Sequence, residues 1–313
     1  MTALLSDTKP ILIAGPTASG KSSLAIDIAK KVNGAIINAD ALQVYKGWSV
    51  LSARPPQEAL DQCPHYMYGH VPMDHAYSAG EWLRGLQNQM NICLNRGERP
   101  IIVGGTGLYF SALTQGLSQI PDVPAPIRAE ADQMIKDHGR HIFADILQKD
   151  DPETYARIDV QNPARTQRAW EVLRATATGL SKWQDHTDAP FLPESGAHLF
   201  SLTSDTDWLN ERIDRRFDIM LDLGALEECQ AALDNGWWDE NQPSCKAIGA
   251  KELIYYLQGS MDLTDAVEAA KLQSRRYAKR QRTWFRGRMK NWKKLHLSDS
   301  QFDLQRILSA KNC

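Results

Sequence analysis

The sequence has few cysteines and no long hydrophobic run, and these two features exclude several classes of protein. Its five cysteines are spread over 313 residues, odd in number, and include no C-x-x-C pair. This pattern excludes a paired-cysteine scaffold or zinc clip, and we expect reduced thiols. No apolar stretch approaches the roughly 18 residues that a membrane span needs, and no basic start precedes an apolar h-region. We therefore expect a cytoplasmic protein with no membrane partner.

One segment lacks acidic residues. Between Glu268 and Asp299 there is no aspartate or glutamate, whereas eleven lysines and arginines fall there. The whole chain has 36 basic and 38 acidic residues, a net charge of −2, so the remainder keeps 25 basic residues and a balance of −13. A positive segment of this kind favours a polyanionic partner.

What the sequence does contain, near its start, is the pattern of a phosphate-binding loop. The apolar run 11–14 is followed by Gly15, Pro16, Thr17, Ala18, Ser19, Gly20, Lys21 and Ser22. In such a loop the backbone amides turn toward phosphate oxygens, the lysine adds positive charge, and the serine offers a hydroxyl to Mg²⁺. A helix over 22–31 adds its positive dipole end. The pattern predicts a polyphosphate site with magnesium as cofactor, against the alternative of a glycine-rich turn that binds nothing.

The first third of the chain alternates short apolar runs with helical patterns. The runs 11–14, 35–38 and 101–103 are typical of buried strands, and a helical spacing of apolar residues separates the last two. This alternation favours an α/β fold, a P-loop NTPase-like parallel sheet flanked by helices.

Two proline-rich breaks indicate an insertion. The first, 120–126, precedes about seventy residues of helical periodicity, and the second, 189–196, precedes the apolar run 198–202, which would return the chain to the sheet. We expect a catalytic core over 1–119 and 198–313, ending in a basic helix, and an all-helical insertion over 120–197.

Polar residues follow the second and third predicted strands. Asp40 comes directly after the second strand, where a parallel sheet places it beside the phosphate loop. A lone aspartate there is often only a helix cap, but the neighbouring loop favours a functional role. Gln43 carries an amide suited to reading a base edge, although a solvated loop residue fits equally well. Thr106, within a G-G-T-G turn, joins the candidate site.

The ordered motifs along the chain resemble those of the tRNA dimethylallyltransferases, also called tRNA isopentenyltransferases. The similarity rests on residues 15–22, 40–45, 64–65, 104–109, 165–171, 212–220, 247–252 and 277–281. Members of this family transfer a dimethylallyl group from its diphosphate to N6 of the adenosine 3′ to the anticodon. Ala41 stands where the family commonly has serine, and residues 51–55 differ from its G-T-A-K-P segment.

The resemblance implies a role for each motif. Lys21, Arg216 and Thr106 would act with Asp40, the general base that accepts a proton from the adenine amine. Without the resemblance, pairing of Arg216 with Asp218 or Glu211 on its own helix is the favoured interpretation. The resemblance implies tRNA contacts by Asp40, Ala41, Leu42, Gln43, Thr106, Arg128, Ala164, Arg165, Thr166, Gln167, Arg168, Arg275, Lys279 and Arg282.

The basic segment has the spacing of an RNA-binding helix. Arg275, Lys279, Arg282 and Arg286 recur at intervals of four, three and four, with aromatic residues between them. A solvated basic helix is the alternative. We expect the target adenosine to be extruded from the anticodon loop into the protein.

Three other functions remain open from the sequence. A small-molecule kinase or nucleotide hydrolase would use the same loop. An enzyme that prenylates free adenine nucleotides would not need the insertion or the basic segment, and an RNA-binding protein would keep the loop as a vestige.

The spacing of five between His65, His70 and His75 suits no common zinc pattern. We expect a monomer whose substrates are tRNA and dimethylallyl diphosphate.

Overall fold

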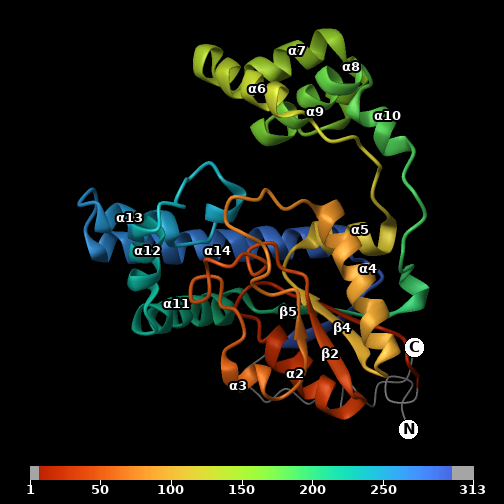
Figure 1. The fold of residues 1–313 in the computed structure, drawn as a ribbon, viewed down its shortest axis with the longest axis vertical. Helices are drawn as coiled ribbons and strands as arrows, with labels where there is room; N and C mark the ends of the chain where they lie inside the picture. Colours follow the sequence, from red (N-terminus) through yellow and green to blue (C-terminus); the bar gives the residue numbers. More distant parts are fainter. Residues whose placement is uncertain (1–6, 298–313) are drawn as a thin grey trace. The chain divides into compact units, whose positions relative to one another are not determined.

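The structure, a computed structural model, describes residues 7–297, which form two compact units (Figure 1). Of the described residues, the larger unit comprises 7–114 and 191–297, and the smaller is Gln115–Pro190. The sequence places the insertion a few residues later, at 120–197. Cys313 lies outside the described residues, and the other four cysteines are free thiols.

A parallel sheet forms the centre of the larger unit, as expected for an α/β fold. Within residues 7–297 its strand order is β3-β2-β4-β1-β5-β6, and every neighbouring pair is parallel. The strands are β1 (Ile11–Ala14), β2 (Gly34–Asn38), β3 (His65–Tyr66), β4 (Arg99–Gly104), β5 (His198–Ser204) and β6 (Lys293–Leu297). The sequence does not reveal β3, with two residues, or β6, a largely exposed edge strand.

Alternating strand residues build a core on each face of the sheet. Leu12, Ile37 and Ile102 pack with helices α4 (Ala79–Asn95) and α5 (Gly107–Gln115), whereas their neighbours pack with α2 (Lys21–Val32) on the other face. Because both faces are covered, the central strands are apolar at nearly every position, which explains why they appear in the sequence as uninterrupted apolar runs.

The helices after β5 pack on one another in a third core. These are α11 (Thr206–Asp222), α12 (Ala225–Asp234), α13 (Ala250–Leu257) and the long α14 (Leu263–Arg288); a short α3 (Gln57–Leu60) lies earlier in the chain. Trp48 is fully buried in this core, and its indole N–H donates to Ser244 O at 2.8 Å. This bond ties the loop after β2 to the C-terminal helices.

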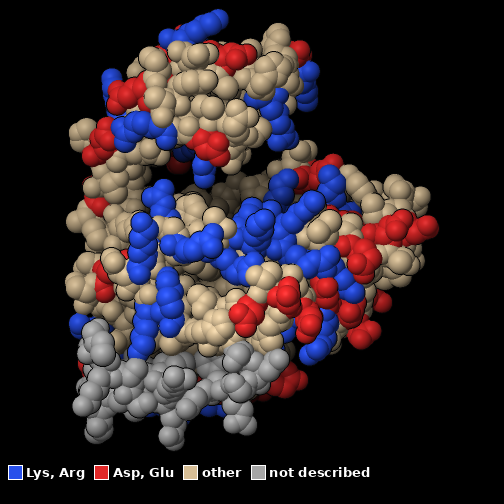
Figure 2. Space-filling view, turned by 180° about the vertical axis from the view of Figure 1, so that it is seen from behind, with Lys and Arg blue, Asp and Glu red and all other residues tan. Residues whose placement is uncertain are grey.

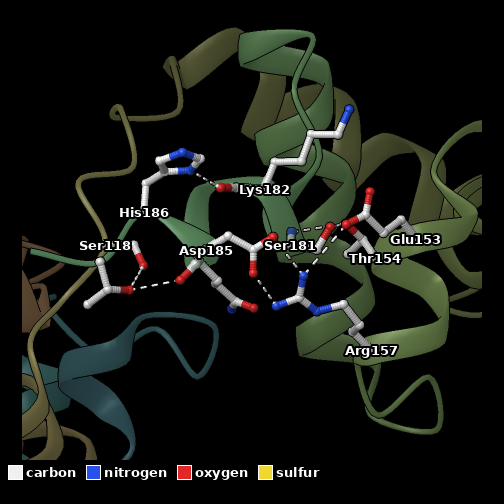
Figure 3. A network of polar contacts seen from close by, with 10 residues as sticks. Ser118, Glu153, Thr154, Arg157, Ser181, Lys182, Asp185 and His186 are labelled. Carbon is white, nitrogen blue, oxygen red and sulfur yellow. Dashed lines mark hydrogen bonds and ion pairs between the residues drawn. The ribbon is translucent and has the colours of Figure 1, made fainter.

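The smaller unit is helical, which confirms the expected all-helical insertion. Its helices are α6 (Ala125–His138), α7 (Ile142–Asp150), α8 (Pro152–Arg157), α9 (Pro163–Thr176) and α10 (Leu180–Asp185). Polar contacts join α8 to α10: Arg157 donates two hydrogen bonds to Asp185, and Thr154 bonds Ser181 (Figure 3). Phe143 and Leu147 are fully buried, so the unit has a core of its own.

Nothing among the helices of residues 7–297 is both long enough and apolar enough to traverse a lipid bilayer.

Two glycines of the larger unit should respond oppositely to substitution. A Cβ on Gly104, at the end of β4, would lie 2.0 Å from Ala39 O, whereas one on Gly287, in the last turn of α14, would meet nothing within 4 Å. We expect Gly104→Ala to destabilise the fold by about 3 kcal/mol through overpacking, and Gly287→Ala to stabilise it by roughly 0.5 kcal/mol. Urea denaturation measures both. Equal effects would contradict the described packing of the loop after β4.

Candidate active site

The candidate site lies at the carboxyl ends of three adjacent strands. The phosphate loop follows β1, Asp40 follows β2, and Thr106 follows β4, which lies between β1 and β2 in the sheet. Parallel strands bring such ends to one edge. The structure thus brings together the loop residues, Asp40 and Thr106.

Hydrogen bonds fix these loops to one another. Gly15 N donates to Gly104 O at 3.2 Å, and Thr106 N donates to Ala39 O at the same distance. The hydroxyl of Thr106 accepts from Ala41 N at 2.9 Å. Thr106 therefore holds the backbone beside Asp40, a structural task that the motif alone does not reveal.

Asp40 is held by short-range contacts in a partly buried setting. Its N–H donates to Asn38 Oδ1 at 2.9 Å, and its Oδ1 accepts from Leu42 N at 3.0 Å. Asn38 is fully buried. Burial raises the pKa of Tyr277, and the negative charge of Asp40 raises that pKa further. The Tyr277 hydroxyl near Asp40 therefore stays protonated at neutral pH.

The phosphate loop has the backbone that its sequence predicts. Gly20, with φ of 82°, caps α2 in a left-handed conformation, and Lys21 Nζ donates to Pro16 O at 3.2 Å. Burial lowers the pKa of Lys21 to about 8; the charge of Asp40 raises that pKa and the charge of Arg216 lowers it. The site therefore contains interacting charges that favour an incoming anion. Ser22 is exposed in the first turn of α2.

Helix α11 supplies two arginines to this loop. Arg216 Nη1 donates to Thr17 Oγ1 at 3.3 Å, and Arg212 Nε donates to Ala18 O at 2.9 Å. The alternative pairing of Arg216 with Asp218 is wrong, because Asp218 pairs with Lys271 at 2.7 Å. Burial lowers the pKa of Arg216, and Asp40 raises it. Arg216 thus belongs to the phosphate site.

A pocket opens beside these residues. Its polar lining consists of Thr17, Asp40, Ser52, Arg216, Ser274 and Tyr277. Its apolar lining consists of Ala18, Leu42, Leu51, Ile213, Phe217, Met220 and Ile248. Such a pocket suits a ligand with a polyanionic end and a short hydrocarbon end.

Sequence reasoning missed Gln281, on α14. This side chain is 5% exposed and hydrogen-bonds both the phosphate loop and the loop after β4. A signal was present, because Ala278 and Phe285 are three residues before and four after it, the spacing of a buried helical stripe.

The amide of Gln43 makes hydrogen bonds within the protein. Its Nε2 donates to Ser52 O at 2.9 Å and to Ala53 O at 2.8 Å. Both donors of the amide are therefore used to hold the loop 51–53, so Gln43 is not a solvated loop residue, and contact of its Oε1 with a base edge stays a prediction.

The four regularly spaced basic residues predicted to bind RNA from α14, Arg275, Lys279, Arg282 and Arg286, fall into two groups, not one. Arg275 contacts Asp214 of α11 at 2.5 Å, and Arg282 donates to Thr206 at 2.8 Å, so both fasten α14 to α11. Lys279 and Arg286 are exposed. Figure 2 shows Lys and Arg side chains gathered across one face of the larger unit.

In the smaller unit, the predicted tRNA-contacting residues lie mainly around the start of α9. Arg128, Ala164 and Arg165 are exposed, whereas Thr166 is buried and its hydroxyl donates to Pro163 O at 3.0 Å. Two others contact Glu171: Gln167 Nε2 at 3.0 Å and Arg168 Nη1 at 3.9 Å. Thr166 thus supports the helix and does not face solvent.

Comparison with known proteins identifies one family along most of the chain. A family model described as "IPP transferase" matches residues 43–288. The chain is 53% identical over 289 residues to a tRNA dimethylallyltransferase from a strain of Cereibacter sphaeroides, covering 92% of this chain and 96% of that protein. It is 49% identical over 290 residues to the tRNA dimethylallyltransferase of Paracoccus denitrificans, covering 92% and 95% of the two chains.

The chain is also similar to solved structures of transferases of this kind. The full-length tRNA isopentenylpyrophosphate transferase of Bacillus halodurans has a TM-score of 0.68 and 31% identity, covering 96% of this chain and 94% of that one. A eukaryotic dimethylallyltransferase acting on tRNA has a TM-score of 0.81 and 27% identity, covering 97% of this chain and 78% of that one.

The pKa of Lys21 makes anion binding depend on pH. Below about pH 8 the lysine is protonated, and as pH rises through that value the free protein loses the proton that diphosphate binding requires. We expect the ratio of wild-type to Lys21→Met affinity for inorganic diphosphate to fall between pH 7 and pH 9.5, toward roughly tenfold per pH unit. Calorimetry measures both affinities, and the ratio cancels the ionisation of the ligand. A constant ratio would show that Lys21 does not contact the anion.

Proposed function

Because the chain belongs to the IPP transferase family, it is a prenyltransferase that modifies tRNA, and we propose that it carries a dimethylallyl group from dimethylallyl diphosphate to N6 of the adenosine 3′ to the anticodon. The observation that carries this proposal is the pocket in which the Arg216 guanidinium, an apolar wall and the Asp40 carboxylate meet.

The donor half of the reaction needs positive charge where the leaving group forms. As the bond between the allylic carbon and oxygen breaks, its electron pair departs with the diphosphate. Lys21, Arg216 and the loop amides surround that position, and Ile213, Phe217 and Met220 line the apolar wall for the hydrocarbon. Loss of one such charged contact raises the barrier by about 3 kcal/mol, by analogy with oxyanion donors.

The acceptor half needs a base. The lone pair of the adenine amine is delocalised into the ring, so the amine becomes a useful nucleophile only if its proton is accepted as the new C–N bond forms. Asp40 Oδ1 is held by Leu42 N, and among residues 7–297 Oδ2 accepts no hydrogen bond. Asp40 Oδ2 is therefore the proton acceptor.

The donor set at the loop fits magnesium. Ser22 offers one exposed hydroxyl, and no group of three or more His, Cys, Asp or Glu side chains able to hold a metal occurs in the part of the chain that the structure describes. Mg²⁺ commonly takes few protein ligands and completes its shell with phosphate oxygens and water. Bound there, it neutralises charge on the leaving diphosphate.

The tRNA half of the site uses the basic surface of α14. Lys279 and Arg286 are exposed and not fastened to α11, so of the four regularly spaced basic residues they are the two available to contact RNA phosphates. The target adenosine reaches Asp40 after extrusion from the anticodon loop. The enzyme acts as a monomer in the cytoplasm, where its tRNA substrates are found.

The central test is transfer itself. Incubation of tRNA with the wild-type protein, dimethylallyl diphosphate and Mg²⁺ should add a five-carbon group to an adenosine beside the anticodon, as measured by mass spectrometry of nuclease digests. Asp40→Asn should lower the rate at least about 100-fold, because it removes a general base. Diphosphate affinity should persist, since a negative charge beside Lys21 and Arg216 is lost. Phosphoryl loss from ATP without RNA, with no transfer to tRNA, would instead indicate a nucleotide hydrolase.

Charge reversal should separate the two groups of basic residues on α14. In Lys279→Glu and Arg286→Glu, tRNA binding should weaken and the slope of log affinity against log salt should fall by about 0.7 to 0.9 for each lost phosphate contact. Diphosphate affinity should not change. The control is Lys31→Glu, which makes the same change of charge at an exposed position of α2. A similar loss in that control would refute a specific RNA contact on α14.

A further inference from the structure

Gln281 occupies the junction between the two loops that serve the two substrates. Its Oε1 accepts from Thr17 N at 2.9 Å, and its Nε2 donates to Gly105 O at 2.9 Å. Both partners are backbone groups, and the side chain is buried. One amide thus joins the phosphate loop to the loop after β4.

Two glycines of the loop after β4 leave room for side chains of α14. A Cβ on Gly105 would lie 2.2 Å from Gln281 Nε2, and one on Gly107 would lie 2.1 Å from the indole ring of Trp284, also on α14. Neither glycine has positive φ. Glycine is therefore required at these positions because a Cβ would collide with side chains of α14, and not because the backbone is left-handed there.

The contact continues to the proposed base. Thr106, next to Gly105, accepts from Ala41 N, next to Asp40. On the other side, Thr17 is held by its amide through Gln281 and by its hydroxyl through Arg216. An unbroken series of hydrogen bonds and peptide units therefore links the residue that Arg216 contacts to the backbone of Asp40.

We propose that Gln281 is a positioning residue, which sets the separation between the diphosphate on the phosphate loop and the proton acceptor Asp40. It touches neither substrate and acts through Thr17 and Gly105. This inference rests on the proposed function, because only a reaction that joins a donor on one loop to an acceptor at the other is sensitive to that separation. The same helix carries Lys279 and Arg286, so the element that binds RNA also aligns the two loops.

The chemistry of the amide makes the proposal specific. The site needs one acceptor and one donor at the end of a side chain of fixed length. In Gln281→Glu the carboxylate accepts from Thr17 N, but its other oxygen faces Gly105 O with no proton to donate. The substitution keeps size and shape, so it removes the tie without opening a cavity.

The first experiment compares Gln281→Glu and Gln281→Ala with Gln273→Ala; Gln273 lies on the same helix, and its side chain makes no hydrogen bond within residues 7–297. Single-turnover transfer is measured with both substrates saturating, together with tRNA affinity, inorganic diphosphate affinity and thermal unfolding. We expect both Gln281 variants to lose about 100-fold in transfer rate, the cost of a small misplacement, with tRNA affinity near that of Gln273→Ala and with the protein still folded at the assay temperature, although the unsatisfied buried groups lower its unfolding temperature. Wild-type transfer rates in both Gln281 variants, or losses that only parallel a fall in stability, would overturn the proposal.

A double-mutant cycle tests the contact itself. Gly105→Ala inserts a methyl group that displaces the Gln281 amide, so it should slow transfer in the wild-type background and add little in the Gln281→Ala background. If the two substitutions together lowered the transfer rate by the product of their separate effects, the two residues would act independently, which would contradict the proposal. Failure of the proposed function is distinguishable, because the wild type and Gln273→Ala would then also leave tRNA unmodified.

Discussion

The constraint on which the site depends is the order of three parallel strands. Because β4 lies between β1 and β2, the loops after these strands meet at one edge of the sheet. The phosphate loop, Asp40 and Thr106 come from distant parts of the sequence, yet a few backbone hydrogen bonds then suffice to fix them. Everything that follows, from the charges to the pocket, requires this convergence.

The electrostatics of the site are those of a receptor for an anion. Two cations, Lys21 and Arg216, lie near one carboxylate, and burial lowers the pKa of both cations. An incoming diphosphate offsets the repulsion between Lys21 and Arg216 and favours the protonated form of Lys21, which burial disfavours. The carboxylate that partly balances them before binding is the group that later accepts a proton. Binding and proton transfer thus use the same small set of charges.

The sequence predicted what local patterns encode. The apolar runs of β1, β2 and β4 and the glycine-lysine pattern after β1 are contiguous signals, so the sheet and its functional edge followed from them. Other features depend on distant partners. The pairing of Arg275 with Asp214, the use of Gln43 to hold residues 51–53 and the burial of Gln281 are set by which helices pack together, and no local pattern states that. The family resemblance supplied Arg216, but only the structure shows why it faces the phosphate loop.

The most direct test of this account is the structure of the protein bound to a non-transferable thiodiphosphate analogue of dimethylallyl diphosphate. The account predicts the diphosphate within hydrogen-bond distance of Lys21 Nζ and Arg216, the hydrocarbon against Phe217 and Met220, and the reactive carbon facing Asp40. A diphosphate bound away from Lys21, or a hydrocarbon directed away from Asp40, would contradict it.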